Sequence, residues 1–355
     1  MTARTPFLCA LACAALCLAA TPLVAQDTPD STKKEKYTSS KFWESTEPFE
    51  LTLSVNIKQL QADKGDPGPW RAATVAYTDG APRAHAARVR TRGRSRLKIC
   101  DRFPPIWVDF QKEDVKGTQL RRLNRFKLVA PCKYPPDYER YVVGEYNVYR
   151  IHQLFTPISH RARLVKLTVK DSASGKEAFT KYAFAVEDID EVAQRVGGVK
   201  MAVEGLTNTD LEPRQLAVMG LLQYMIGNTD FSFSARHNLE FVVREGKIYP
   251  IIFDYDQAGV INTVYSLPDA SLGIRKVTER VYRGLCVSPD TIHAVLADMK
   301  AKRPAIEALY KDELGKLMGG MMASTAVRYI GGFYSEVENP KNVQRNIIDR
   351  CAIAR

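Results

Sequence analysis

Histidine is scarce in this sequence, and its five residues lie far apart. A zinc site needs paired ligand spacing, and no such spacing is seen among His85, His152, His160, His237 and His293. A Gly-x-Ser-x-Gly motif, which marks the nucleophile of many serine hydrolases, is also missing from the 355 residues. These two absences argue against a zinc enzyme and against a Ser-His-Asp hydrolase.

Apolar runs long enough to span a membrane are absent too. The run over residues 7–20 follows a single charge, Arg4, and precedes small residues up to Ala25. A spanning helix needs about 20 apolar residues, whereas this three-part pattern predicts a cleaved signal peptide over residues 1–25. We therefore expect an exported protein, periplasmic or extracellular, with no transmembrane segment in the mature chain.

Only four cysteines follow the predicted signal peptide: Cys100, Cys132, Cys286 and Cys351. None has metal-ligand spacing, and an even number in an exported chain indicates disulfides. Four cysteines permit three pairings. Their places in the chain favour Cys100 with Cys132 and Cys286 with Cys351.

Charge is unevenly distributed along the chain, whose formal net charge is +11. Residues 83–127 hold 14 Lys or Arg against 4 Asp or Glu. Within them, every second residue from Arg88 to Lys98 is a cation, which predicts a strand over residues 86–99 with six cations on one face. Such a face is either solvated or turned towards phosphate groups or an acidic surface. Nucleic acid is not expected as a partner of an exported protein.

The apolar pattern changes along the chain from strand-like to helical. Residues 26–45 are polar without a period and predict a flexible linker. Residues 46–190 alternate apolar and polar positions, which predicts a β-rich lobe with one helix over residues 138–155. For residues 191–355 the pattern predicts a mainly helical lobe that contains one hairpin. We expect an α+β protein whose two lobes clasp a ligand.

The hairpin carries the candidate site. Its predicted strands, residues 239–243 and 248–253, flank a turn at residues 245–246, so the numbers of paired residues sum to 491. Asn238 then lies opposite Phe253 and beside Asp254, close enough for both side chains to bind one cation. Mg²⁺ prefers such oxygen ligands. Asp256 is either a further ligand or a turn former.

Three motifs in this region resemble those of a known family. They are GNTD at residues 227–230, HN at 237–238 and FDYDxxG at 253–259. They resemble the catalytic loop and metal-binding segment of the CotH-like kinases, atypical relatives of the protein kinase fold. RGRS at 92–95 is similar to that family's Arg-Gly-rich turn, and FKL at 126–128 to its strand lysine segment. The resemblance covers residues 85–262.

The resemblance implies a two-lobed protein-kinase-like fold and transfer of phosphate from ATP, with Mg²⁺ or Mn²⁺, to a protein or small-molecule acceptor. Asp230 would be the catalytic residue. Apart from the resemblance, His237 is expected to support either Asp254 or Asp230 through a hydrogen bond. The implied metal ligands are Asn238, Asp254 and Asp256. The implied nucleotide-binding residues are Lys127, which would pair with Glu145, and Arg92 and Arg94.

The sequence also departs from the family pattern. Thr229 stands where the catalytic loop usually has arginine, Asp230 and Asn238 are further apart than in ordinary kinases, and no Gly-rich phosphate loop is present. ATP is scarce outside the cytoplasm. The alternative is therefore an inactive pseudokinase that serves as a periplasmic or surface binding protein for an acidic partner.

Overall fold

The computed structural model describes residues 38–100, 102–202 and 205–353, apart from the side chain of Arg94. These residues belong to one unit, Tyr37–Arg355. The predicted signal peptide (1–25) and residues 26–37 of the predicted linker lie outside the described residues. Within the described ranges, no helix is long and apolar enough to cross a membrane.

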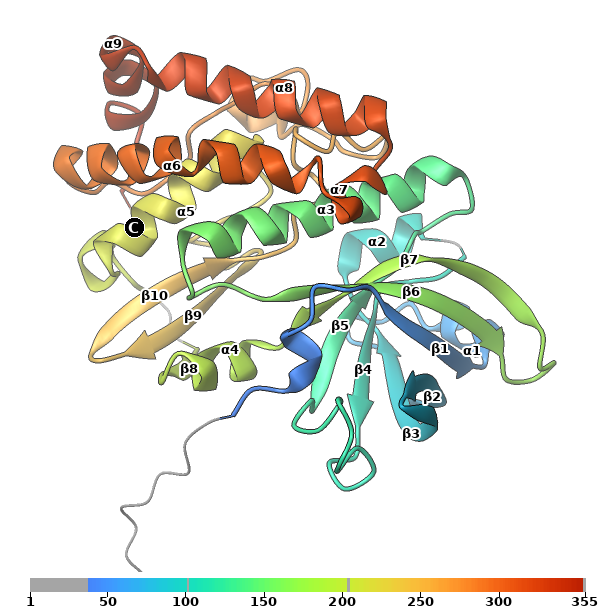
Figure 1. The fold of residues 1–355 in the computed structure, drawn as a ribbon. Helices are drawn as coiled ribbons and strands as arrows, with labels where there is room; N and C mark the ends of the chain where they lie inside the picture. Colours follow the sequence, from blue (N-terminus) through green and yellow to red (C-terminus); the bar gives the residue numbers. More distant parts are fainter. Residues whose placement is uncertain (1–37, 101, 203–204, 354–355) are drawn as a thin grey trace, which may run out of the picture. The chain divides into compact units, whose positions relative to one another are not determined.

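Seven strands of the first half of the chain form a closed β-barrel (Figure 1). In barrel order they are β1 (Phe49–Val55), β2 (Arg71–Asp79), β3 (Ala81–Thr91), β4 (Ile106–Phe110), β5 (Arg125–Val129), β7 (Glu177–Glu187) and β6 (Ala162–Asp171). All neighbours are antiparallel except β1 and β6, which pair in parallel from Phe49 opposite Val165 onwards. This parallel pair closes the barrel.

Alternating apolar side chains fill the barrel. In β1 the residues at every second position are buried, as expected for a strand with one face turned inwards. Leu53, Val75, Val108 and Phe126 each come from a different strand and are fully buried in one cluster. Closure removes the exposed strand edges that an open sheet would present.

The prediction of a two-lobed protein-kinase-like fold is wrong, because the N-terminal strands form this closed mixed barrel rather than the sheet of a kinase lobe. The physical cause is the pairing of two long strands, β6 with 10 residues and β7 with 11. β7 pairs with β5, and β6 pairs with β1 more than a hundred residues earlier in the chain. Hydrophobic alternation identifies such strands but does not reveal their partners. The division into residues 46–190 and 191–355 stays a prediction.

Helices and a small sheet make up most of the remaining structure (Figure 1). The three-stranded sheet has the order β10 (Lys247–Ile252), β9 (Leu239–Arg244) and β8 (Val199–Met201). The long helices are α3 (Pro136–Phe155), α5 (Pro213–Ile226), α6 (Pro289–Leu309) and α8 (Gly320–Val337). The short elements are η1 (Lys41–Trp43), α1 (Ile57–Ala62), α2 (Arg94–Ile99), α4 (Ile189–Arg195), η2 (Asn208–Asp210), η3 (Ala270–Leu272), α7 (Glu313–Lys316), α9 (Pro340–Val343) and η4 (Gln344–Ile348).

Helix α3 packs against both the barrel and the long helices. It contacts barrel strands β6 and β7 on one hand and helices α5 and α6 on the other. Twelve of its residues are buried, among them the charged Glu145. A charged residue in such a position needs a partner, because an unpaired buried charge is costly. Helix α3 therefore brings Glu145 into the interior, where the candidate site lies.

The predicted basic strand over residues 86–99 is wrong beyond Thr91, where β3 ends. Gly93 adopts a φ of 86°, which favours glycine, and α2 begins at the next residue. The cations therefore do not share one face. Arg88 and Arg90 both stack on Trp70, at 4.6 and 4.4 Å, whereas Arg96 is buried.

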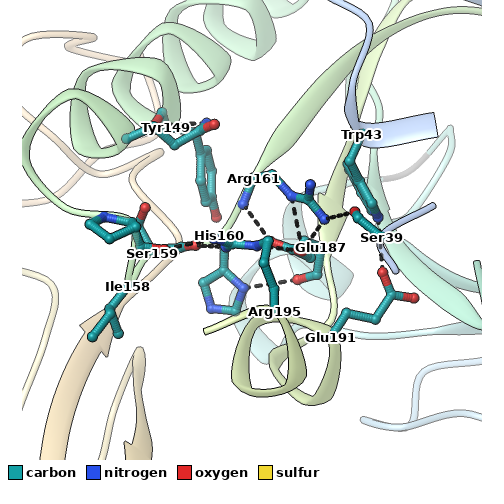
Figure 2. A network of polar contacts seen from close by, with 12 residues as sticks. Ser39, Trp43, Tyr149, Ile158, Ser159, His160, Arg161, Glu187, Glu191 and Arg195 are labelled. Atoms are coloured by element: carbon teal, nitrogen blue, oxygen red, sulfur yellow. Dashed lines mark hydrogen bonds and ion pairs between the residues drawn. The ribbon is translucent and has the colours of Figure 1, made fainter. Parts of the chain in front are cut away.

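The end of the predicted flexible linker is folded against the rest of the unit (Figure 2). Trp43 is buried, and its Nε1–H donates to Glu191 Oε2 at 2.9 Å. The Arg161 guanidinium donates to Ser39 Oγ at 2.6 Å and to the buried Glu187 at 2.6 Å. The linker prediction is therefore wrong from residue 38 onwards, because Trp43 and its neighbour Phe42 bury apolar surface.

Both predicted disulfides are confirmed. Cys100 at the end of α2 is bonded to Cys132, and Cys286 is bonded to Cys351 near the C-terminus. Stable disulfides form in oxidising compartments. They are compatible with an exported protein.

Candidate functional site

The predicted register of the hairpin is confirmed. Arg244 pairs with Lys247 and Leu239 with Ile252, and the Phe253 amide donates to the carbonyl of Asn238 at 3.2 Å. Asn238 and Asp254 have φ values of 53° and 66°, a left-handed conformation that Asn and Asp tolerate better than most residues. Both residues thus leave the strands at the same end of the hairpin.

Asp230 is held by the two residues of the HN motif. His237 Nε2 lies 3.0 Å from Asp230 Oδ1. The Asn238 amide donates to the Asp230 carbonyl oxygen at 2.8 Å and to Asp230 Oδ2 at 3.2 Å. His237 thus contacts one of the two partners expected for it, while its supporting role stays a prediction, and the Asp230 side chain remains 39% exposed. A carboxylate fixed in this way and open to solvent can accept a proton from a bound hydroxyl.

A buried arginine binds three carboxylates beside this loop. Arg96 Nε donates to Asp256 Oδ2 at 2.8 Å, and Arg96 Nη2 donates to Glu145 Oε2 at 2.6 Å and to Asp254 Oδ1 at 3.3 Å. We call these four residues the Arg96 cluster. They come from α2, from α3 and from the segment after β10.

The Arg96 cluster has more negative than positive charge. Burial raises the pKa of Glu145 to about 8 and the pKa of Asp256 to about 6, although Arg96 opposes both shifts. Burial also acts to raise the pKa of Asp254, but the charges of Arg96 and Arg92 outweigh it and hold that pKa below its ordinary value. One guanidinium is therefore too little charge to keep all three carboxylates ionised, and added positive charge would be favourable there.

Backbone and tyrosine contacts fix the carboxylates in place. The Asp254 amide donates to the Tyr149 hydroxyl at 3.1 Å, and the Tyr255 amide donates to Glu145 Oε1 at 3.4 Å. The Tyr255 hydroxyl lies 2.8 Å from His152 Nδ1. Since these tyrosines are buried, the segment after β10 is attached firmly to helix α3.

The predicted pair of Lys127 with Glu145 is not formed. Lys127 Nζ lies 3.7 Å from Glu240 Oε2 on β9 and 3.9 Å from the centre of the Phe253 ring. Glu240 Oε2 also lies 3.1 Å from His160 Nε2. Burial lowers the pKa of Lys127, and Glu240 opposes this shift. Lys127 does not pair with Glu145 because Arg96 already binds the Glu145 carboxylate.

The remaining predicted residues differ in how closely they approach the cluster. Arg92 follows β3, and its charge acts on both Asp254 and Lys127. Arg94 begins α2, and the predicted role of its side chain lies outside what the structure describes. Asp230 contributes to raising the pKa of Asp256, after larger effects of burial and of Asp254. The loop and the cluster are thus electrostatically linked.

Sequence reasoning missed two residues of this region, Arg96 and Glu240. Arg96 was counted among the cations of a strand face, although the glycine at position 93 signals a break in that strand. Glu240 is an acidic residue within the strand sequence LEFVV, two positions after Asn238. A charged residue that interrupts a buried strand is a signal for a buried partner.

Carboxylate and amide oxygens are the donor types that fit Mg²⁺. Across the described part of the chain, however, no three His, Cys, Asp or Glu side chains are arranged as a metal-binding group. In this conformation Asp254 and Asp256 are oriented towards Arg96 instead. The donor chemistry fits a divalent cation, and its binding would require these contacts to Arg96 to change.

The sequence was compared with models of known protein families and with curated proteins, and neither comparison finds a match.

Proposed function

We propose that this protein transfers a phosphoryl group from a Mg²⁺-bound nucleoside triphosphate, ATP in the first instance, to a hydroxyl group of an acceptor. The observation that carries the proposal is the arrangement at one end of the hairpin, where Asn238 holds Asp230 and where Asp254 and Asp256, after the facing strand, bind Arg96. The resemblance of the GNTD, HN and FDYDxxG motifs to those of the CotH-like kinases supports the same chemistry.

The residues of the chain have separate tasks in the proposed reaction. Asp230 accepts the proton of the acceptor hydroxyl, while His237 and Asn238 keep its carboxylate in position. The hydroxyl oxygen forms a bond to the γ-phosphorus, the bond from that phosphorus to the bridging oxygen breaks, and the nucleoside diphosphate leaves. When bound, Mg²⁺ would supply positive charge to the phosphate oxygens.

Arg96 would change partners in this scheme. In the structure its guanidinium balances part of the charge of Glu145, Asp254 and Asp256. Asp254 and Asp256 would hold the divalent cation in place of Arg96. Glu145, which has the shortest contact with Arg96, would retain it.

Two conservative variants test the proposal. Asp254→Asn keeps the shape of the side chain and its left-handed backbone but removes a charge from the cation site. Asp230→Asn removes only the proposed proton acceptor. We expect Asp254→Asn to lose binding of Mg-ATP in calorimetry and Asp230→Asn to retain it, while both lose phosphate release from ATP in the presence of Mg²⁺. Equal binding of Mg-ATP by Asp254→Asn and the wild type would contradict the proposal.

A second candidate is a binding protein without catalytic activity that recognises an acidic partner outside the cytoplasm. It is favoured by the pairing of Lys127 with Glu240 and of Glu145 with Arg96, which leaves neither Lys127 nor Glu145 in the predicted nucleotide-binding role. Arg88 and Arg90 on β3 would then meet the partner. Arg88→Glu with Arg90→Glu should elute from a heparin column at lower salt than the wild type, because exposed charges act over about 10 Å at moderate salt.

The proposed place of action is the periplasm or the extracellular space. The disulfides support it, since a protein of the reducing cytoplasm rarely keeps such bonds. Mass analysis of the secreted or periplasmic fraction without reductant would test it, with the expected N-terminus at Gln26.

A further inference from the structure

The residues directly after Asp230, in the catalytic loop of the proposed reaction, line a cavity of about 790 Å³. Phe231 and Phe233 of that loop form part of its wall. The other walls come from Leu272, from residues 281–285 and from the C-terminal segment. Its volume is in the range that holds a single small ligand.

Among the described residues that line this cavity, each one that is charged at neutral pH is an arginine. They are Arg236 of the loop, Arg283 and Arg350. Burial acts to lower the pKa of Arg283, and Asp269 and Asp230 oppose it. Three cations around one cavity, with no acidic residue among the lining residues that the structure describes, favour an anionic group on the ligand.

The rest of the lining is largely apolar. Phe231 and Phe233 meet edge to face at 6.5 Å, and Leu272, Val281 and Leu285 lie near them in the lining. Ile353 also lines the cavity and is 72% exposed. A lining that is mostly apolar and aromatic, with a few charged groups, is typical of a site for a small ligand.

Arg283 connects the cavity with the proposed proton acceptor. Its guanidinium donates to the carbonyl of Thr229, the residue before Asp230, and lies 5.3 Å from the Phe231 ring. Since Asp230 and Phe231 are neighbours in the chain, a ligand in this cavity would lie next to the exposed Asp230 carboxylate.

We propose that the cavity binds a small amphiphilic anion, a molecule with an apolar body and a phosphate or carboxylate group, and that this molecule is the acceptor. The apolar body contacts Phe231, Phe233 and Leu272, and the anionic group lies among the arginines. A hydroxyl of the same molecule faces Asp230. The role as acceptor rests on the proposed phosphoryl transfer, whereas binding of the anion does not.

The binding test uses the fluorescent probe 1-anilinonaphthalene-8-sulfonate, which has an aromatic body and one negative charge. Its titration is followed without nucleotide and then reversed with decyl phosphate, decanoate or decyltrimethylammonium below their micelle concentrations. We expect the anionic chains to displace the probe and the cationic chain to leave it bound. The anion that displaces it at lower concentration identifies the preferred head group.

Variants locate the binding. Arg350→Glu and Leu272→Glu should each weaken probe binding about tenfold or more, as expected for the loss of a charge-assisted contact or an apolar contact. Arg328→Glu is the matched control, because Arg328 is exposed on α8 outside the cavity lining. Binding that is equally weak in this control, or unchanged in Arg350→Glu, would overturn the proposal.

The same titration separates this inference from the proposed function. Asp254→Asn should bind the probe as the wild type does, because Asp254 is not part of the cavity lining. Displaceable probe binding without any Mg-ATP binding would leave the anion site standing and remove phosphoryl transfer. Mg-ATP binding without displaceable probe binding would overturn the anion site and leave the proposed phosphoryl transfer standing.

Discussion

Arg96 is the residue on which the electrostatics of the candidate site depend. It is buried and binds Glu145, Asp254 and Asp256 through a single guanidinium. Arginine suits this position, because its planar group donates in several directions and stays charged when buried. A lysine could not make the same set of contacts. The charge balance of the Arg96 cluster thus depends on this one guanidinium and on three carboxylates.

Replacing Arg96 should test for the proposed cation site. Arg96→Gln leaves three buried carboxylates without their guanidinium, and removing one partner of a buried ion pair costs about 3–5 kcal/mol. We expect the variant to melt at lower temperature than the wild type in EDTA and to gain more stability from millimolar Mg²⁺. Differential scanning fluorimetry measures both effects.

Arg163→Gln is the control for this experiment. Arg163 is also buried, but its guanidinium donates to the carbonyls of Phe42 and Glu47 rather than to carboxylates. This variant should be destabilised without gaining a response to Mg²⁺. A Mg²⁺ response of the same size in both variants would show that the ion does not act at the Arg96 cluster.

Glu191 should make stability depend on pH (Figure 2). Burial raises its pKa from 4.5 to about 7, although Trp43 donates a hydrogen bond to its carboxylate. A raised pKa in the folded state means that the associated stability is complete below pH 4.5 and is lost as the pH rises through 7. The change is on the order of 3 kcal/mol.

The variant Glu191→Gln isolates this effect, because glutamine remains uncharged and can still accept from Trp43. Urea unfolding between pH 5 and pH 8 should show a smaller loss of stability in the variant than in the wild type. An identical pH dependence in the two proteins would contradict the assigned role of Glu191.

At the scale of elements, the barrel and the small sheet are joined by a buried ion pair. Lys127 on β5 meets Glu240 on β9, and His160 contacts the same carboxylate. Both partners are largely removed from water, so the loss of either leaves an uncompensated charge. This contact determines where the end of the hairpin lies with respect to the barrel strand.

A double-mutant cycle measures that contact. Glu240→Gln should cost about 3–5 kcal/mol because it leaves Lys127 buried without its carboxylate. Lys127→Met in the Glu240→Gln background should recover part of this loss, since no unpaired cation remains. Urea unfolding gives the four stabilities, and strictly additive effects would show that the two side chains do not interact.

Secondary-structure elements were predictable where a short stretch of sequence determines their geometry. The turn at Glu245 and Gly246 fixes the register of the hairpin, so the placement of Asn238 beside Asp254 followed from counting residues. The strand over residues 86–99 was not predictable by the same means, because a period of two continues through Gly93 while the backbone does not. Arg96 was therefore assigned to a surface, although the helix turns it inwards.

At the scale of the whole molecule, the sequence pattern did not reveal which two strands pair to close the barrel. The pairing of Phe49 with Val165 joins strands that are distant in the chain, and nothing in either strand specifies the other. The disulfides were easier, because only four cysteines remained after the predicted signal peptide. The Lys127–Glu145 pair was assigned by resemblance, and it failed because Arg96 competes for Glu145.

The Cys286–Cys351 disulfide should contribute strongly to global stability. It closes a loop across 65 positions of the chain, and loop-closure entropy assigns about 4 kcal/mol to a bond of that span. The variant Cys286→Ala with Cys351→Ala should unfold at lower urea concentration, because its free energy of unfolding is lower by about 4 kcal/mol. The matched pair Cys100→Ala with Cys132→Ala, across 32 positions, should lose slightly less. A loss well under 1 kcal/mol in the first variant would contradict this expectation.

The central claim is that the hairpin end binds a Mg²⁺–nucleotide through Asp254. The most direct test is the melting temperature of the full chain with EDTA, with Mg²⁺ alone and with millimolar Mg-ATP, for the wild type and Asp254→Asn. A ligand at 100 times its dissociation constant adds about 2.7 kcal/mol to the native state. We predict that Mg-ATP raises the melting temperature of the wild type by several degrees beyond Mg²⁺ alone and leaves Asp254→Asn unchanged. An unchanged melting temperature of the wild type in millimolar Mg-ATP would contradict the account.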